Sequence, residues 1–301
     1  MTPASRCLVL LLPLLAACTP AKPPAPVEPP RYVVGEPYQM GGTWSYPRED
    51  FALRETGLAT VVADARAGRL TADGEVYDPD WLTAAHRTLQ LPAILVVTNL
   101  ENGLELRVRV NDRGPAQAGR LLALSRRAAE LLRVQPGGTQ VAISVDGDAS
   151  RALAAGLPQP DAMRIAIATA PRETLQSESL APPPGSRAAD RVRQAPAARS
   201  FVAPPAEATA ASATPQRLPE AVDQGMARPG QLYVQGSTFT AREAAQRQAA
   251  RMPGARVEAF GPGRRPEYRV RLGPFASVSQ ADQGLEIARR SGVSEARILV
   301  D

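Results

Sequence analysis

Cysteine and histidine are nearly absent from this chain of 301 residues. The two cysteines, Cys7 and Cys18, both fall within the first eighteen residues, and His86 is the single histidine. The chain after Cys18 therefore has no disulfide and no cysteine-based metal site, and one histidine without partners at ligand spacing does not make one. The folded parts must be held by packing alone, and we expect no metal and no other cofactor.

Long runs of one residue type are also missing. The formal net charge is +5, but no run of five basic residues occurs, so we expect no nucleic-acid partner and favour an acidic glycan. The apolar run Cys7 to Leu15 is too short to span a bilayer as a helix. It follows Arg6 and ends in small residues, which is typical of a secretion signal.

The end of this signal, Leu15-Ala-Ala-Cys18, resembles a bacterial lipobox, in which the cysteine becomes the lipidated N-terminus. We therefore expect a lipoprotein signal peptide over residues 1–18, with Cys18 as the lipid anchor. An ordinary signal in which Cys18 is incidental is the alternative. Thr19, rather than aspartate, follows the cysteine and indicates the outer membrane, facing the periplasm. Residues 19–31 are rich in proline and predict an extended spacer.

Residues 32–147 predict a small β domain. Its first part, Tyr32 to Pro47, has aromatic residues among turn residues and is interpreted as an ordered strap over the domain. The later part contains a strong hairpin signal, Asn102-Gly103, and one helical segment with Ser125 as its N-cap, so we expect a short helix on a closed barrel. Apolar segments predict strands at 57–62, 93–99, 104–110 and 140–145.

The remaining chain divides into a linker and a second domain. Residues 148–230 begin with a helix-like stretch at 149–156, and residues 171–230 are rich in Ala, Pro, Ser and Arg, which predicts disorder. Residues 231–301 predict the order β-α-β-β-α-β, a ferredoxin-like unit. Its strands are expected at 232–236, 256–260, 267–272 and 296–300, and its helices at 240–252 and 279–291.

Seven motifs carry a family resemblance. They are Thr71-Ala-Asp-Gly-Glu-Val-Tyr-Asp78, Thr83-Ala-Ala-His86, Val97-Thr-Asn-Leu-Glu-Asn-Gly103, Val110-Asn-Asp-Arg-Gly-Pro115, Gly119-Arg120 with Leu124-Ser125, Tyr233-Val-Gln-Gly-Ser237 with Phe239, and Tyr268-Arg-Val-Arg-Leu-Gly-Pro-Phe275. In this order and spacing they resemble the rare lipoprotein A family. The resemblance implies a six-stranded double-psi β-barrel, a disordered linker and a ferredoxin-like SPOR domain.

The family resemblance also implies an activity. Active members are endolytic lytic transglycosylases that act on peptide-stripped glycan strands of peptidoglycan at the division septum. They break the MurNAc–GlcNAc β-1,4 bond and close a 1,6-anhydro ring, a reaction that needs one carboxyl group as acid and then as base. The implied partners are peptidoglycan, the outer membrane through the lipid on Cys18, and septal proteins.

Candidate site residues of the barrel follow from the motifs. The resemblance implies Asp112 as acid and base, with Glu75, Asp78 and His86 around it. Arg113 and Tyr77 are the expected substrate-binding residues of the barrel. Two alternatives stay open: Asp112 belongs only to a turn with a local hydrogen bond, and His86 makes only a structural hydrogen bond.

In the SPOR-like unit, the resemblance implies glycan binding by the exposed face of the sheet. The expected residues are Gln235, Ser237, Phe239, Tyr268 and Arg271. Arg269 and Arg271 share one strand face and are suited to pair with lactyl carboxylates. Solvated charges and core packing are the alternatives.

Three departures from the family pattern weigh against catalysis. Val61-Val62 stands where the family has Trp-Tyr, and Arg66-Ala-Gly68 stands where it has Phe-x-Gly, so aromatic platforms for sugars are missing. Ala123 stands where an acidic residue is usual. The alternative function is therefore a non-catalytic, peptidoglycan-binding lipoprotein of the septum.

Overall fold

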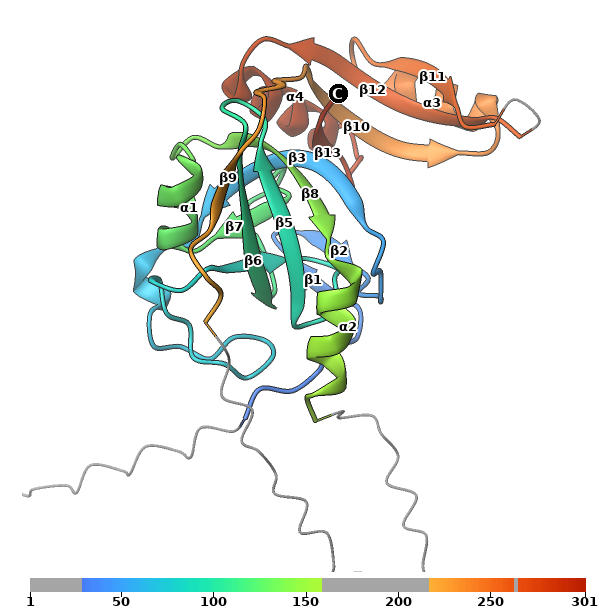
Figure 1. Cartoon of the computed structure of the whole chain (residues 1–301). Helices are drawn as coiled ribbons and strands as arrows, with labels where there is room; N and C mark the ends of the chain where they lie inside the picture. The colour runs from blue at the N-terminus through green and yellow to red at the C-terminus, as the bar shows by residue number, and fades with distance from the viewer. Residues whose placement is uncertain (1–28, 159–216, 263–264) are drawn as a thin grey trace, which may run out of the picture.

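The computed structural model describes residues 29–158, 217–262 and 265–301. The expected signal peptide, Cys18, most of the spacer and the middle of the expected linker lie outside these residues. Figure 1 shows a β-barrel with a second, smaller domain packed against one end of it.

The barrel is closed by six strands. They are β3 (Arg54–Val61), β4 (Thr83–His86), β5 (Ala93–Asn99), β6 (Leu104–Asp112), β7 (Leu122–Leu124) and β8 (Thr139–Val145). The strand order is β4-β7-β3-β8-β5-β6, and pairing of β6 with β4 completes the ring. Alternate side chains, such as Leu95, Val97, Val108 and Val110, fill the interior and are fully buried. The predicted double-psi β-barrel is confirmed.

Short elements connect the strands as the sequence signals predict. Gly103 has φ +79° in the hairpin between β5 and β6, a conformation that suits glycine. The hydroxyl of Ser125 accepts a hydrogen bond from the N–H of Ala128, which confirms Ser125 as the N-cap of α1 (Arg126–Leu132). The other helical segments of this domain are η1 (Asp64–Arg66) and α2 (Gly147–Ala155), and α2 confirms the helix expected at 149–156.

The strap forms an ordered hairpin on the barrel. Its strands are β1 (Tyr38–Met40) and β2 (Thr43–Ser45). Two arginines of the barrel bind its backbone: Arg113 donates to the carbonyl of Val34, and Arg87 donates to the carbonyl of Met40. The strap is thus fixed to the barrel by charged donors as well as by its own pairing.

The second domain has the predicted β-α-β-β-α-β order. Its elements are β10 (Leu232–Phe239), α3 (Arg242–Arg251), β11 (Arg256–Phe260), β12 (Glu267–Phe275), α4 (Val278–Arg290) and β13 (Arg297–Val300). The sheet order is β11-β12-β10-β13. Val234 and Val270 of the sheet pack with Ala245 of α3 and Leu285 of α4 in one core. The opposite face of the sheet carries polar side chains.

The linker prediction is wrong at its C-terminal end. Residues 217–230 are ordered, and β9 (Val222–Gln224) pairs antiparallel with β6 beside the barrel (Figure 1). Val222 also packs against the barrel core. The prediction of disorder rested on the small number of apolar residues in this segment. β9 is instead held by backbone hydrogen bonds to the edge of β6.

The two domains contact each other directly, although the sequence suggested only a tether. Leu58 of β3 points out of the barrel and is fully buried in the core of the second domain. The guanidinium of Arg120 donates two hydrogen bonds to the carboxylate of Asp282 on α4, at 2.6 and 2.9 Å. At Gly119, an added Cβ would lie 2.6 Å from Leu285 and 2.9 Å from Ile298, so only glycine permits this approach.

Replacing Leu58 with alanine is expected to lower the free energy of unfolding by about 2–5 kcal/mol. The reason is that Leu58 is fully buried between the domains, where truncation leaves a cavity. Urea unfolding measures the change. The matched control is Leu70→Ala, because Leu70 is 61% exposed and its loss should cost within about 0.5 kcal/mol. Equal stability of the two variants would contradict the docking of the second domain on β3.

Among the described residues, none of the helices combines the length and the apolar character needed to cross a membrane.

Candidate functional site

Asp112 lies at the end of β6, where its carboxylate is held by three donors. One oxygen accepts from the N–H groups of Ala72 (3.1 Å) and Arg113 (2.8 Å). The other lies 2.7 Å from the guanidinium of Arg66, which belongs to η1. The Asp112 side chain retains 14% exposure. A fixed carboxylate that keeps partial exposure can exchange a proton with a bound ligand.

Glu75 helps to position Asp112 through buried hydrogen bonds. Its carboxylate accepts from the guanidinium of Arg109 at 2.8 Å and from the side-chain amide of Asn111 at 2.7 Å, and all three residues are buried. Asn111 precedes Asp112 in β6, so these bonds tie the loop at 71–75 to the strand end. Glu75 therefore positions the loop that supplies the Ala72 N–H to Asp112.

Asp73 is a buried carboxyl group that sequence reasoning missed. Its side chain accepts from the Thr71 hydroxyl at 2.7 Å and from the Glu75 N–H at 3.1 Å. Burial, followed by the charge of Glu75, raises the pKa of Asp73 to about 7. The sequence signal was the placement of Asp73 only two residues before Glu75 in a tight loop.

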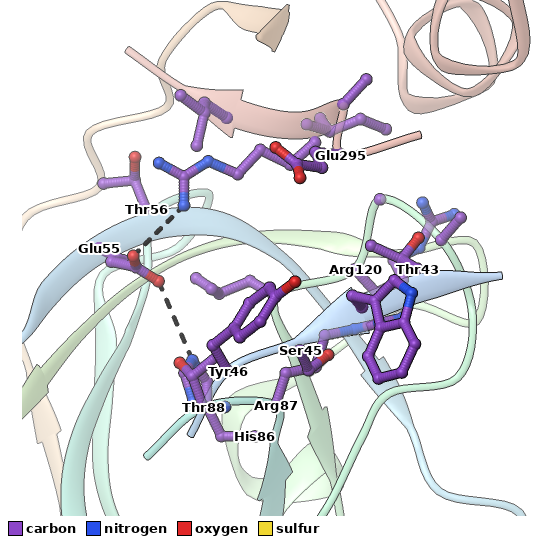
Figure 2. A pocket seen from close by; sticks show the side chains of 18 of the residues that line it. Thr43, Ser45, Tyr46, Glu55, Thr56, His86, Arg87, Thr88, Arg120 and Glu295 are labelled. Carbon is purple, nitrogen blue, oxygen red and sulfur yellow. Dashed lines mark hydrogen bonds and ion pairs between the residues drawn. The ribbon is translucent and has the colours of Figure 1, made fainter. Parts of the chain in front are cut away.

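His86 lies at the end of β4 and is buried. Its Nδ1 accepts from the N–H groups of Thr88 (3.3 Å) and Leu89 (3.2 Å), which assigns the ring proton to Nε2. Burial, with the charges of Arg113 and Arg87, lowers the pKa of His86 to about 3. His86 is therefore a neutral donor near pH 7. Its Nε2 lies 3.9 Å from a carboxylate oxygen of Glu55, a second residue that the sequence did not single out (Figure 2).

The other predicted residues of the barrel have structural contacts. Asp78 accepts from the N–H of Asp80 at 2.8 Å in a turn. Tyr77 is buried, and burial raises the pKa of its phenol. The guanidinium of Arg113 donates to the carbonyls of Leu89 and Val34, so it anchors the strap. The side chains of Asp78 and Arg113 are thus occupied by contacts within the protein, whereas the buried Tyr77 hydroxyl has no hydrogen-bond partner among the described residues.

Ala123 lies in one row with Asp112 across neighbouring strands. Asp112 pairs with Ala85, Ala85 with Ala123, and Ala123 with Thr60. Because Ala84 lies in the barrel core, Ala85 faces the opposite side. An acidic side chain at position 123 would stand two strands from Asp112, about 10 Å away at the usual strand spacing. The small side chains of Ala85 and Ala123 occupy these positions instead.

The predicted residues of the second domain divide between the two faces of its sheet. Phe239 and Tyr268 pack against the core on the helical side. Gln235 is buried in β10, and the N–H and hydroxyl of Ser237 both bond the side chain of Gln248. The structure therefore brings Arg271 and its register partner Gln235, rather than the whole predicted set, onto the polar face.

Arg271 forms a compact cluster on that face. Its guanidinium lies 3.8 Å from the centre of the Tyr233 ring and donates to Glu258 at 3.1 Å and Asp301 at 2.8 Å. Arg269 also contacts Glu258, at 3.3 Å. The shared face predicted for the two arginines is confirmed, and both are already paired with a carboxylate.

The two shifted groups of the barrel predict opposite pH effects on stability. The pKa of His86 is 6.5 in the unfolded chain and about 3 in the folded protein, so its contribution is lost as pH falls through this window. The pKa of Asp73 is 3.8 unfolded and about 7 folded, so its contribution is lost as pH rises. Between about pH 4 and 6.5, His86 makes the free energy of unfolding rise with pH and Asp73 makes it fall. Each effect amounts to at most about 1.4 kcal/mol per pH unit.

His86→Gln is expected to make the free energy of unfolding fall more steeply as pH rises across this window. Asp73→Asn should have the opposite effect, because it leaves the slope of His86 uncompensated. Urea unfolding at three pH values between 4.5 and 6.5 measures both slopes, with the exposed Asp80→Asn as control. Identical pH profiles in all four proteins would contradict the assignment.

Within the ranges that the structure describes, no group of three or more His, Cys, Asp or Glu side chains is arranged to hold a metal ion.

Comparison with known proteins supports this description of the two domains. A family model described as lytic transglycolase matches residues 55–144, and a model described as SPOR domain matches residues 229–298. The endolytic peptidoglycan transglycosylase RlpA of Pseudomonas aeruginosa strain UCBPP-PA14 is 31% identical over 265 residues, covering 85% of this chain and 74% of that protein. RlpA of Vibrio cholerae is 41% identical over 113 residues, covering 35% of this chain and 43% of that protein.

A solved structure, the RlpA SPOR domain from Pseudomonas aeruginosa, is 21% identical and covers 23% of this chain and 99% of that chain, with a TM-score of 0.22. The family assignment rests on the relatives that match along most of their length. With its barrel and its C-terminal domain in the same order, the chain belongs to the RlpA family.

Proposed function

We propose that this protein is an endolytic lytic transglycosylase that cleaves peptide-stripped glycan strands of peptidoglycan. The observation that carries the proposal is Asp112, whose carboxylate is fixed by two backbone N–H groups and Arg66 and keeps 14% exposure. The family membership supports an enzyme of the lyase class with a peptidoglycan-binding domain.

The reaction needs one carboxyl group in two successive roles. Asp112 first donates a proton to the glycosidic oxygen, so that the C1–O4 bond of MurNAc breaks and GlcNAc leaves with a 4-hydroxyl. Asp112 then takes the proton of the MurNAc 6-hydroxyl as that oxygen bonds to C1. The ring closes without water, and the carboxyl group ends the cycle protonated.

The neighbouring residues assist this chemistry in different ways. Arg66 and the N–H of Ala72 hold the carboxylate in place. Glu75 is a positioning residue, because it acts through Asn111 and the loop. His86 is a neutral N–H donor on β4, next to Ala85, the register partner of Asp112, and its Nε2 faces Glu55.

Two features favour a second candidate function, glycan binding without cleavage. The carboxylate of Asp112 is paired with Arg66, and the row of register partners beside it contains Ala123 instead of an acid. A binding module needs neither a free carboxylate nor a second acid.

One assay separates the two functions. The purified protein is incubated with amidase-treated, peptide-free glycan strands, and the soluble products are analysed by mass spectrometry while binding is measured by pelleting. Release of sugars with 1,6-anhydroMurNAc ends is the expected result. If the protein pellets with the strands but releases no such product, its function is glycan binding and the proposed enzymatic activity is wrong.

We further propose that the protein is an outer-membrane lipoprotein anchored through Cys18 and enriched at the septum with other septal proteins. The domain limits of the proposal are those expected from the sequence, with residues 217–230 reassigned to the ordered part. Replacing Cys18 with serine should abolish metabolic labelling by palmitate and release the protein from the membrane fraction. A variant that is still labelled would exclude Cys18 as the anchor.

A further inference from the structure

A cavity of about 550 Å³ lies where the strap, the barrel and the C-terminal domain meet. Figure 2 shows side chains from all three parts facing it, with Tyr46 of the strap opposite Glu55 and His86 of the barrel, and Glu295 of the C-terminal domain across the opening. Its volume falls within the range of small-molecule sites. It therefore has room for sugar rings.

The strap contributes two aromatic rings to this cavity. Trp44 is 55% exposed and Tyr46 is 61% exposed, although large aromatic side chains usually bury most of their surface. Among the described residues, Trp44 and Tyr46 are the two exposed aromatic side chains, and both line this cavity. More than half of the surface of each residue is thus exposed and can contact the apolar C–H face of a pyranose ring.

The cavity also carries a cation suited to an acidic sugar. Arg87 lines it and donates to the carbonyls of Met40 (3.2 Å) and Ala116 (3.5 Å). Across the described part of the chain, no carboxylate lies within ion-pair distance of Arg87. A guanidinium with only neutral partners can donate charge-assisted hydrogen bonds to a ligand carboxylate.

The C-terminal domain forms the opposite wall. Arg297 of β13 reaches Glu55 of β3 at 3.4 Å, and Glu55 in turn faces His86 (Figure 2). The Arg297 side chain is 54% exposed, so this ion pair is a weak one that a ligand can rearrange. The wall thus offers both a donor and an acceptor to sugar hydroxyl and N-acetyl groups.

We propose that this cavity is a saccharide subsite built by both domains, with Trp44 and Tyr46 stacking on sugar rings and Arg87 pairing with the lactyl carboxylate of a MurNAc residue. The inference rests on the proposed function for the identity of the glycan. It assigns to the strap the aromatic platform that β3 lacks at Val61-Val62. Glu55 and His86 form part of its barrel wall, and Asp112 is not among the residues that line it.

Titration calorimetry with soluble, peptide-free GlcNAc–MurNAc oligomers tests the subsite. The protein carries Asp112→Asn throughout, so that the oligomers are not cut during the measurement. Trp44→Ala is expected to weaken binding about tenfold or more, since truncated aromatic anchors dominate binding losses. The control, Met226→Ala, removes a side chain that is 77% exposed and lies outside the cavity, and should leave the affinity unchanged.

A second pair of variants tests the contribution of the C-terminal domain. Arg297→Gln is expected to weaken binding about threefold to tenfold. Arg290→Gln is the matched control, because Arg290 is an exposed, ion-paired arginine of the same domain outside the cavity. Loss of affinity only with Arg297→Gln supports a site shared by both domains.

Fluorescence separates stacking from a folding defect. Trp44 is one of two tryptophans, so Trp44→Phe should keep most of the affinity but abolish the ligand-induced change in emission. Equal affinity of Trp44→Ala and Met226→Ala would overturn the subsite, whether or not the wild type cuts glycan. Binding that depends on Trp44, in a protein whose wild type releases no anhydro sugar, would retain the subsite and remove the enzyme activity.

Discussion

Replacing Asp112 with asparagine is expected to slow release of anhydro sugars from peptide-free glycan strands by about 10²- to 10⁴-fold. Asparagine keeps the size of the side chain, and its oxygen can still accept from the N–H groups of Ala72 and Arg113. An amide, however, cannot donate and then take back the proton that the reaction transfers. Initial rates measured by mass spectrometry give the effect, and unchanged urea unfolding excludes a folding defect.

The matched control for this prediction is Asp80→Asn. Asp80 is an exposed aspartate that also contacts an arginine, Arg126, at 2.6 Å, but it lies outside the cluster around Asp112. Its replacement should change the rate by less than about twofold. An Asp112→Asn protein that cuts as fast as this control would show that another group transfers the proton.

Replacing Glu75 with alanine is expected to lower the free energy of unfolding by about 3–5 kcal/mol. The substitution removes the carboxylate that binds the buried guanidinium of Arg109 and accepts from the Asn111 amide. Removing one partner of a buried pair is costly because the remaining charge cannot regain solvent. Urea unfolding at pH 7 measures the loss.

Glu286→Ala serves as the control for Glu75→Ala. Glu286 pairs with Arg290 at 3.3 Å on the surface of α4, and both side chains are more than half exposed. Exposed pairs of this kind contribute about 0–1 kcal/mol. Similar losses for the two variants would mean that the Arg109–Glu75 pair is open to solvent.

Most of the architecture was predictable from residue patterns. The long strands of the barrel carry enough alternating residues for the pattern to be visible, and β5 was predicted with its exact ends. β4 and β7 were missed because they have four and three residues, too few for a period of two to emerge. In the barrel, these short strands are placed by their neighbours rather than by their own sequences.

The mostly apolar run at 57–62, interrupted only by Thr60, carried information that was not recognised. A strand with one face on a barrel core should alternate, yet Leu58 and Ala59 are both fully buried. The second buried face is explained by the C-terminal domain, which covers Leu58. Contacts between distant segments are not encoded in local periodicity, so only the structure reveals them.

The candidate site was predictable to the extent that it lies in motifs. Glu75 binds Asn111, the chain neighbour of Asp112, whereas the contacts of His86 are with Thr88, Leu89 and Glu55. Arg66 and Glu55 were not predicted, because their roles depend on which side chains face them across the fold. Arg113 was assigned to substrate, but its guanidinium binds two carbonyls of this chain.

The docking of β13 on the barrel has a consequence for dissecting the protein into fragments. β13 is an edge strand, and its carbonyl at Val300 accepts from the Thr56 hydroxyl while Leu58 fills the adjacent core. A C-terminal fragment beginning near residue 231 would uncover both the strand edge and the apolar residues beside it. Bare strand edges recruit further strands. Such a fragment should self-associate in solution. Adding the separate barrel fragment should dissociate these assemblies, because β3 would again cover β13 and the apolar residues beside it.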